Sequence, residues 1–319
     1  MKITVLAGGV GGSRFLRGLR THVLAELPKS EITAIVNVGD DMWLSGVRIA
    51  PDLDTIMYTL AGQNDEDRGW GRAGESERVS AELRAYGVGW PWFTLGDLDL
   101  GTHLARTSLL RDGLTLSQAT ARITARWDLG VRLLPSTDSE VETHVEVNDG
   151  RSMHFQEWWT RHRAALPARR FIFDSVEQSA PAPGVLEAIA EADVVLVAPS
   201  NPVVSIGPIL AIPGVRHALR STSAAVVGVS PIISGRVVRG MADACLTAVG
   251  VETKAHAVAA HYGPRSTDGV IDAWLVDETD ASSVAAIEAM GIRSAAVALW
   301  MRDAQSSAQV ARDALVLAE

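Results

Sequence analysis

Short apolar runs alternate along the chain with segments of helical periodicity. The apolar runs lie at Lys2–Ala7, Glu31–Val38, Asp193–Pro199, Ala224–Val229, Ala273–Val276 and Ala295–Trp300. Several lack the polar alternation of a half-exposed strand, which is typical of a parallel sheet that is covered on both faces. Helical periodicity is found at Arg14–Leu27, Val185–Ala192, Arg236–Val249, Ser282–Met290 and Asp303–Leu317. The pattern predicts an α/β fold with a doubly wound, mostly parallel, Rossmann-like sheet.

The pattern changes between about residues 101 and 180. Two helical segments are followed there by short strands, and Asn148-Asp149-Gly150 predicts a hairpin turn between Thr143–Val147 and Arg151–Phe155. We therefore expect a nucleotide-binding core of residues 1–100 and 181–319, with an inserted α/β cap subdomain at 101–180 over the substrate site. The polar, glycine-rich residues 64–76 predict a loop near this site.

A glycine-rich segment follows the first apolar run. It contains Gly8, Gly9, Gly11, Gly12, Ser13 and Arg14. Glycines let a ligand approach the backbone, and the N–H groups and dipole at a helix start favour an anion, most often a phosphate. Arg14 adds a fixed positive charge. The Walker spacing and the third small residue of the dinucleotide fingerprint are both missing. We expect a phosphate cradle; the alternative is a turn that lets helix and strand pack.

Four carboxylates follow the second apolar run within fifteen residues. They are Asp40, Asp41, Asp52 and Asp54. Oxygen ligands of this kind suit Mg²⁺, which binds one or two carboxylates together with substrate phosphates. The alternative is a pair of solvated turns, with Asp52 and Asp54 capping a helix at Thr55–Leu60. Next to a phosphate cradle, the cluster favours a metal or substrate site.

Two further segments carry polar side chains. Residues 198–210 place Ser200, Asn201 and Ser205 after a strand, and Ser230 follows the next strand. These small side chains can bind a base, ribose or phosphate, unless the segment is an ordinary proline-rich loop. The second segment, residues 94–111, contains Thr94, Asp97, Asp99, His103 and Arg106. His103 can share a helix face with Arg106, which suits a substrate carboxylate or phosphate, although a lone histidine is more often structural.

Composition narrows the classes of function. The 319 residues are 47% hydrophobic, which is enough for a large core. The net charge of −9 argues against a nucleic-acid surface. Cys245 is the only cysteine, so no intrachain disulfide can form. We see no signal-peptide pattern, and polar and proline residues interrupt the most apolar stretch, Val194–Val215. We expect a soluble, cytoplasmic protein with no membrane partner.

Taken together, these segments resemble the 2-phospho-L-lactate transferases of coenzyme F420 biosynthesis, the CofD/FbiA group. The matching segments are LAGGVGGSRFLRGL, NVGDDMWLSG, APDLDT, LGDLDLGTH, RDGLTL, MHFQEWW, APSNPVVSIGPIL and VSPII, in the family's order. The resemblance implies a doubly wound core with an inserted region over the ligand. It also implies a transferase that joins a guanosine-diphosphate-activated three-carbon acid to the ribityl hydroxyl of the deazaflavin FO, releasing GMP.

That reaction suggests a role for each candidate residue. We expect the donor's guanosine half at Ser200, Asn201, Ser205 and Ser230, and its phosphates at Gly9, Gly11, Gly12, Ser13 and Arg14. Asp41 and Asp54 are the expected Mg²⁺ ligands and catalytic carboxylates, and Asp54 has the alternative role of orienting the FO hydroxyl or accepting its proton. Thr94, Asp97 and His103 are expected near the acceptor, FO.

Some details stay open at this point. Some family members carry lysine at the position of Arg14, and the three-carbon group is lactyl, enolpyruvyl or phosphoglyceryl in different members. The alanine- and arginine-rich composition favours a bacterial protein and the phosphoenolpyruvyl donor. Two other classes compete, a sugar-nucleotide pyrophosphorylase and a nucleotide-sugar-binding regulator of the gluconeogenesis-factor type. The apolar C-terminal half leaves room for a homodimer.

Overall fold

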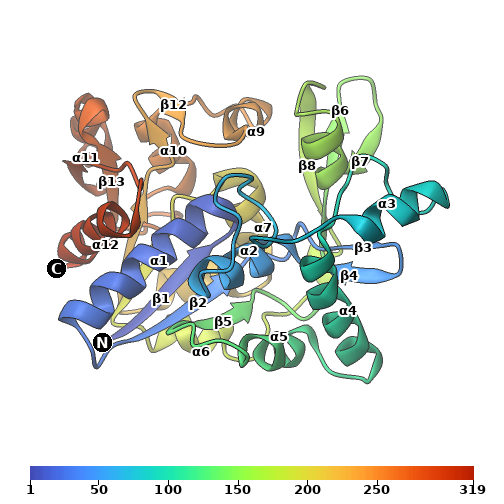
Figure 1. Ribbon diagram of the computed structural model, residues 1–319. Coiled ribbons are helices and arrows are strands. Elements are labelled where there is room, and N and C mark those ends of the chain that lie inside the picture. The colour runs from blue at the N-terminus through green and yellow to red at the C-terminus, as the bar shows by residue number, and fades with distance from the viewer.

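A seven-stranded parallel sheet forms the centre of the computed structural model, which describes all 319 residues (Figure 1). Its strands in spatial order are β14 (Arg293–Val297), β13 (Ala273–Asp277), β10 (Ala225–Val229), β9 (Val194–Val197), β1 (Lys2–Ala7), β2 (Glu31–Val36) and β5 (Arg132–Pro135). The chain adds β2 and β5 on one side of β1 and the later strands on the other. The predicted fold class is confirmed, with its topological switch point between β1 and β9.

Helices cover both faces of this sheet, so its strands carry apolar residues on both sides. One face packs against α1 (Gly9–Glu26), α2 (Pro51–Leu60) and α12 (Ala304–Ala318). The other face packs against α6 (Val185–Ala190), α7 (Gly207–Ala211), α8 (Val215–Ser221) and α10 (Ala255–Tyr262). β9 is buried along its whole length, which explains the absence of polar alternation in its sequence.

Several predicted boundaries shift in the structure. The first helix begins at Gly9 rather than Arg14, so the glycines form its first turn. The segment predicted as a helix at Arg236–Val249 contains β12 (Arg236–Val237), a turn and α9 (Ala242–Ala248), because Gly240 has a φ of +78°. The last strand of the sheet lies at Arg293–Val297 instead of Ala295–Trp300. The other predicted helices correspond to α6, to α11 (Val284–Glu288) and to α12.

Smaller elements surround the carboxyl edge of the sheet. They are β3 (Met42–Leu44), β4 (Val47–Ile49), α3 (Arg78–Ala85), α4 (Asp97–Arg111), α5 (Leu116–Thr124), β6 (Glu142–Val147), β7 (Ser152–His154), a π-helical turn (Glu157–Arg161), β8 (Ala168–Asp174) and β11 (Ile232–Ile233). The predicted hairpin is confirmed as β6–β7, and β8 extends it to a three-stranded sheet that lies opposite α9 in Figure 1. The segment predicted as a cap, residues 101–180, also supplies β5, the edge strand of the central sheet.

No single helix in the structure is long and apolar enough to cross a membrane. One bent pair, Pro202–Ala211 with Val215–Ser221, meets the length and composition criteria with an angle of 86° between its halves.

Candidate functional site

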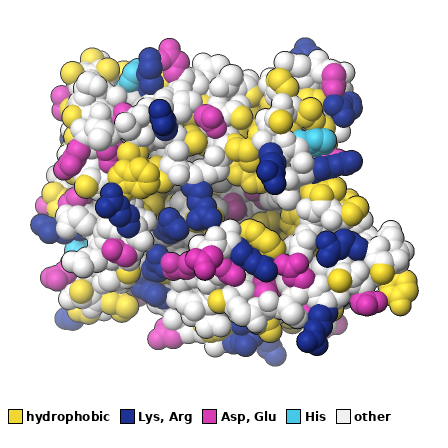
Figure 2. All heavy atoms as spheres, turned by 45° about the horizontal axis from the view of Figure 1, so that its top comes forward, with side chains coloured by type: hydrophobic (Ala, Val, Ile, Leu, Met, Phe, Trp, Pro, Cys, Tyr) yellow, Lys and Arg dark blue, Asp and Glu magenta, His cyan; other side chains and the backbone are white.

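A cavity of about 890 Å³ opens at the carboxyl edge of the sheet. Its wall contains residues that directly follow β1, β9 and β10, namely Gly8, Ser200 and Ser230, and also Asp40 in the turn after β2. The cavity therefore lies at the switch point, where ligands bind in doubly wound sheets. Figure 2 shows the hollow near the middle of one face, with arginine or lysine side chains along its rim.

The start of α1 faces this cavity. Gly8 is extended and precedes a helix that has no side-chain cap and no acidic residue in its first turn. A Cβ atom on Gly8 would overlap the Asp52 carboxylate of α2, so only glycine fits there. Burial raises the pKa of this carboxylate, and a hydrogen bond from the Gly9 N–H offsets part of that rise. The positive end of the helix is thus already turned toward one anionic side chain of the protein.

The remaining glycines have a packing role. A Cβ atom on Gly11 would overlap the carbonyl oxygen of Pro199, and one on Gly12 would lie 2.8 Å from the Ser200 Oγ. Ser200 fixes the same junction, because its Oγ donates to the Gly8 carbonyl oxygen at 2.7 Å. Close packing of α1 on the loop after β9 therefore explains Gly11 and Gly12, although Gly11 also lines the cavity.

Ser13 and Arg14 have different surroundings in the structure. Ser13 is buried, its hydroxyl donates to the Val10 carbonyl oxygen at 3.0 Å, and it does not line the cavity. Gly12 does not line it either, so the structure places these two predicted phosphate ligands outside the cavity wall, with Ser13 in a small pocket that Arg14 also lines. Arg14 lines the cavity together with Gly9.

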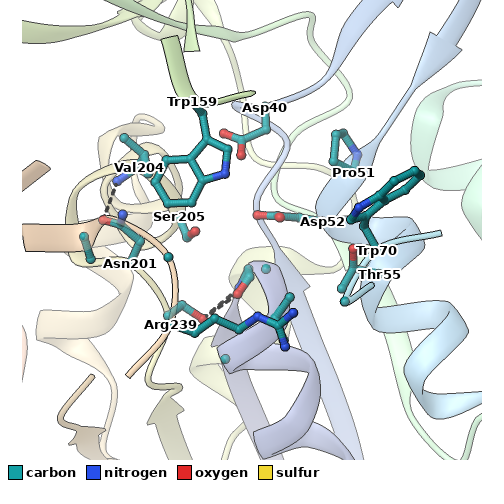
Figure 3. Close-up of a pocket in the computed structure, with 18 of the residues that line it drawn as sticks. Asp40, Pro51, Asp52, Thr55, Trp70, Trp159, Asn201, Val204, Ser205 and Arg239 are labelled. Carbon is teal, nitrogen blue, oxygen red and sulfur yellow. Dashed lines mark hydrogen bonds between the residues drawn. The ribbon is translucent and has the colours of Figure 1, made fainter. Parts of the chain in front are cut away.

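Two carboxylates, Asp40 and Asp52, point into the same part of the cavity, between Trp159 and Pro51 (Figure 3). The Asn37 Nδ2 donates to Asp52 Oδ2 at 2.9 Å and to Asp40 Oδ1 at 3.4 Å. Burial raises the pKa of Asp52 to about 6. Burial and the neighbouring charge of Asp52 raise the pKa of Asp40 well above its ordinary value. The pair therefore holds more negative charge than its surroundings neutralise.

Asp41 lies away from the cavity, contrary to its predicted role as a metal ligand. It is completely buried, and neither carboxylate oxygen has a hydrogen-bond partner. Its closest cation is Arg48, whose Nη2 is 3.9 Å from the Asp41 Oδ2. Burial raises the pKa of Asp41 to about 8. The structure therefore places Asp40, and not the predicted Asp41, in the wall of the cavity.

Asp54 lines the cavity but is engaged by a buried arginine. The Arg106 Nη1 donates to Asp54 Oδ2 at 3.0 Å, and Nη2 donates to Oδ1. Arg106 therefore binds an aspartate of the protein, and not a substrate anion as its sequence position suggested. His103 follows at 3.4 Å from Asp54 and at 3.2 Å from Asp99. Asp54, Asp99 and His103 are close enough to hold a metal, but the two-pronged Arg106 contact fits an ion-pair network better.

Only some of the predicted acceptor residues line the cavity. Thr94 and His103 line the cavity. Asp97 does not, because it lies at the start of α4 and accepts hydrogen bonds from the Ser76 Oγ and the Val79 N–H. The structure therefore does not bring this predicted acceptor residue to the cavity wall. A set of aromatic side chains lines the cavity instead: Trp70, Trp92, Phe93, Phe155, Trp159 and Trp300. The sequence contains nine tryptophans, but it does not show which of them reach the cavity.

The four predicted nucleotide contacts, Ser200, Asn201, Ser205 and Ser230, all line the cavity. Two of them also hold their own loops. The Asn201 Oδ1 accepts from the N–H groups of Val203 and Val204, as Figure 3 shows for Val204. The Ser230 Oγ bonds the backbone of Ile232. The structure therefore brings the loops after β9 and β10 together beside the start of α1.

Comparisons with protein families and with curated proteins indicate one family, and the comparison with solved structures shows the fold. A family model described as 2-phospho-L-lactate transferase CofD matches residues 3–313. A phosphoenolpyruvate transferase from Kitasatospora aureofaciens is 55% identical over the whole chain and 98% of its own length. One from Mycolicibacterium smegmatis is 52% identical over the whole chain and 99% of its length. The crystal structure of protein BH3568 from Bacillus halodurans has the same fold, with a TM-score of 0.64 at 20% identity, covering 98% of this chain and 99% of that one.

Proposed function

The chain belongs to the CofD family of 2-phospho-L-lactate transferases, and from this membership and the cavity we propose its reaction. It transfers a phosphoenolpyruvyl group from a guanosine-diphosphate-activated donor to the ribityl hydroxyl of FO (7,8-didemethyl-8-hydroxy-5-deazariboflavin), releasing GMP, in coenzyme F420 biosynthesis. Relatives that share more than half of their residues with the chain are named phosphoenolpyruvate transferases, which favours this group over 2-phospho-L-lactyl.

The main support for the proposal is that one cavity contains both an aromatic surface and a surface that can bind an anion. Trp70, Trp92 and Trp159 offer flat apolar faces that suit the deazaflavin ring. The start of α1 and Arg14 offer N–H groups and positive charge that suit a diphosphate. At about 890 Å³, the cavity is at the upper end of the usual range for small-molecule sites, so it has room for parts of two substrates.

Asp40 and Asp52 fit a divalent cation. They are two buried carboxylates that share one amide donor and repel each other, and this donor set is oxygen-only, as Mg²⁺ prefers. In our proposal they replace Asp41 and Asp54 as the metal ligands. A bound Mg²⁺ would neutralise the charge of the donor's phosphates.

The residues of the chain act mainly by positioning and by charge. In the transfer, the FO hydroxyl oxygen forms a bond to the phosphorus that carries the three-carbon acid, the bond from that phosphorus to the GMP oxygen breaks so that GMP departs, and the hydroxyl proton passes to water. Arg14 and the N–H groups of α1 stabilise the negative charge on the departing phosphate. Asp54, fixed by Arg106, lies in the cavity wall where it can orient the hydroxyl.

Mass spectrometry of the reaction product tests this function. The purified protein is incubated with FO, Mg²⁺ and each candidate donor in turn: the enolpyruvyl, lactyl and phosphoglyceryl diphosphoguanosines. We expect GMP and the dehydro product, formed fastest with the enolpyruvyl donor. Absence of an FO adduct with every donor would refute the proposal, and pyrophosphate formed from GTP and a sugar phosphate would support the pyrophosphorylase alternative.

A further inference from the structure

Arginines with and without ion-pair partners meet at the mouth of the cavity. Arg17 pairs with Glu66 at 2.5 Å, and Arg68 pairs with Glu77 at 2.9 Å. Arg14 and Arg239 both line the cavity, and neither takes part in an ion pair with a carboxylate. Burial, followed by repulsion from Arg239 and Arg17, lowers the pKa of Arg14. Two guanidinium groups thus share one space without an ion pair of their own, because the nearby Glu66 is paired with Arg17.

Arg239 reaches this position from a loop on the far side of the cavity. It lies between β12 and α9, and its side chain extends toward the loop of residues 64–76, near Thr55 and Trp70 (Figure 3). Its Nη2 donates to the Arg68 carbonyl oxygen at 3.5 Å. A Cβ atom on Gly69 would overlap the Arg239 guanidinium group, so the absence of a side chain at Gly69 makes room for this group.

We propose that Arg239 and Arg14 form a two-sided clamp on the diphosphate of the donor nucleotide. This inference rests on the proposed function. It adds a binding residue, Arg239, which lies in a segment that the sequence pattern predicted to be helical. Guanidinium groups that converge without a carboxylate are stabilised when an anion bridges them. A diphosphate offers phosphoryl oxygens on two sides, whereas a single carboxylate offers its two oxygens on one side only. Arg14 holds it from the fixed first turns of α1, and Arg239 holds it from the loop.

Nucleotide binding by the intact protein tests the clamp. Titration calorimetry with GDP, GMP and FO, each with Mg²⁺, compares the wild type with Arg239→Gln, Arg239→Lys and Arg236→Gln. Arg236 lies in β12, three residues before Arg239, is exposed and does not line the cavity, so it is a matched control. We expect Arg239→Gln to weaken GDP binding roughly ten- to a hundredfold, with a much smaller effect on GMP and none on FO. Lysine should restore part of the affinity.

Two outcomes would overturn the clamp. Unchanged GDP affinity in Arg239→Gln would do so, and so would an equal loss for GDP and FO, which would indicate a general change in the cavity. The reaction product is measured separately. A protein that binds GDP through Arg239 but makes no FO adduct would refute the proposed function and leave the clamp in place.

A pair of glycine substitutions tests the contact between Gly69 and Arg239. Gly69 and Gly74 lie in one loop with φ angles of +76° and +70°, so alanine strains the backbone similarly at both. Only the new Cβ at Gly69 displaces Arg239, because nothing lies within 4 Å of a Cβ at Gly74. We expect Gly69→Ala to shift the Arg239 guanidinium group and to weaken GDP binding, by less than Arg239→Gln does because this group ends a flexible side chain, and to add no further loss to Arg239→Gln. Equal GDP affinities of the two alanine variants would contradict the clamp.

Discussion

Replacement of Arg106 by glutamine tests whether Asp54 is a metal ligand or half of a buried ion pair. Arg106 is 2% exposed and Asp54 is 4% exposed. Arg106 donates to both oxygens of Asp54 and, at 3.3 Å, to the Arg48 carbonyl oxygen. Burial acts to lower the pKa of Arg106, but the charge of Asp54 and its hydrogen bonds raise it overall. The glutamine variant leaves Asp54 buried without its cation.

The expected cost follows from this burial. Removing one member of a buried ion pair costs about 3–5 kcal/mol, because the remaining charge stays out of water without a partner. For a chain of this size, that corresponds to a fall in melting temperature of about 4–8 °C. Asp54→Asn should cost a similar amount, since it leaves the Arg106 charge unpaired. The double variant, Asp54→Asn with Arg106→Gln, should recover roughly half or more of the sum, because no charge remains unpaired.

Thermal and urea unfolding of the four proteins measure this coupling. A metal-ligand role for Asp54 predicts a different result: Asp54→Asn would then keep its metal-free stability and lose only the stabilisation that Mg²⁺ adds. Additive losses in the double variant, or a loss below about 1 kcal/mol in Arg106→Gln, would refute the ion-pair interpretation. Each variant is measured with Mg²⁺ and with EDTA, so that the two roles are separated in one experiment.

Three other predictions use different parts of the molecule. Asp52→Asn should raise the Mg²⁺ concentration for half-maximal transfer by roughly an order of magnitude or more; an unchanged Mg²⁺ titration would contradict the proposed site. Burial lowers the pKa of His154 to about 4, so its titration costs no stability above about pH 6.5 and destabilises the fold increasingly as the pH falls toward 4, because the unfolded chain then binds a proton that the folded chain does not; His154→Gln should reduce the fall in melting temperature between pH 7 and pH 5. Gly11→Ala should cost about 1–3 kcal/mol by overlap with Pro199, whereas Gly101→Ala, in the open middle of α4, should stabilise by about 0.5–1 kcal/mol; unfolding curves that rank them in the opposite order would contradict this packing.

The sheet could be predicted because each of its central strands is buried on both faces. β1, β9, β10 and β13 are therefore short runs without polar alternation, and such runs are visible in the sequence. The start of α1 was harder to predict. Glycine disfavours a helix, yet close packing on Pro199 requires Gly11 inside the first turn. The same residue type therefore suggested a loop where tertiary contacts impose a helix.

The candidate site shows what the local sequence can and cannot reveal about a residue. The chemical type of the acidic cluster was predictable, but the members that face the cavity were not. Asp52 and Asp54 lie about 200° apart around α2, so they point to different surroundings. Asp52 meets Asn37 and the start of α1, while Asp54 meets Arg106 of α4. These partners lie 15 and 52 positions away along the chain. The role of each carboxylate is therefore set by contacts that form only when α2, α4 and β2 have packed, and local spacing contains no information about them.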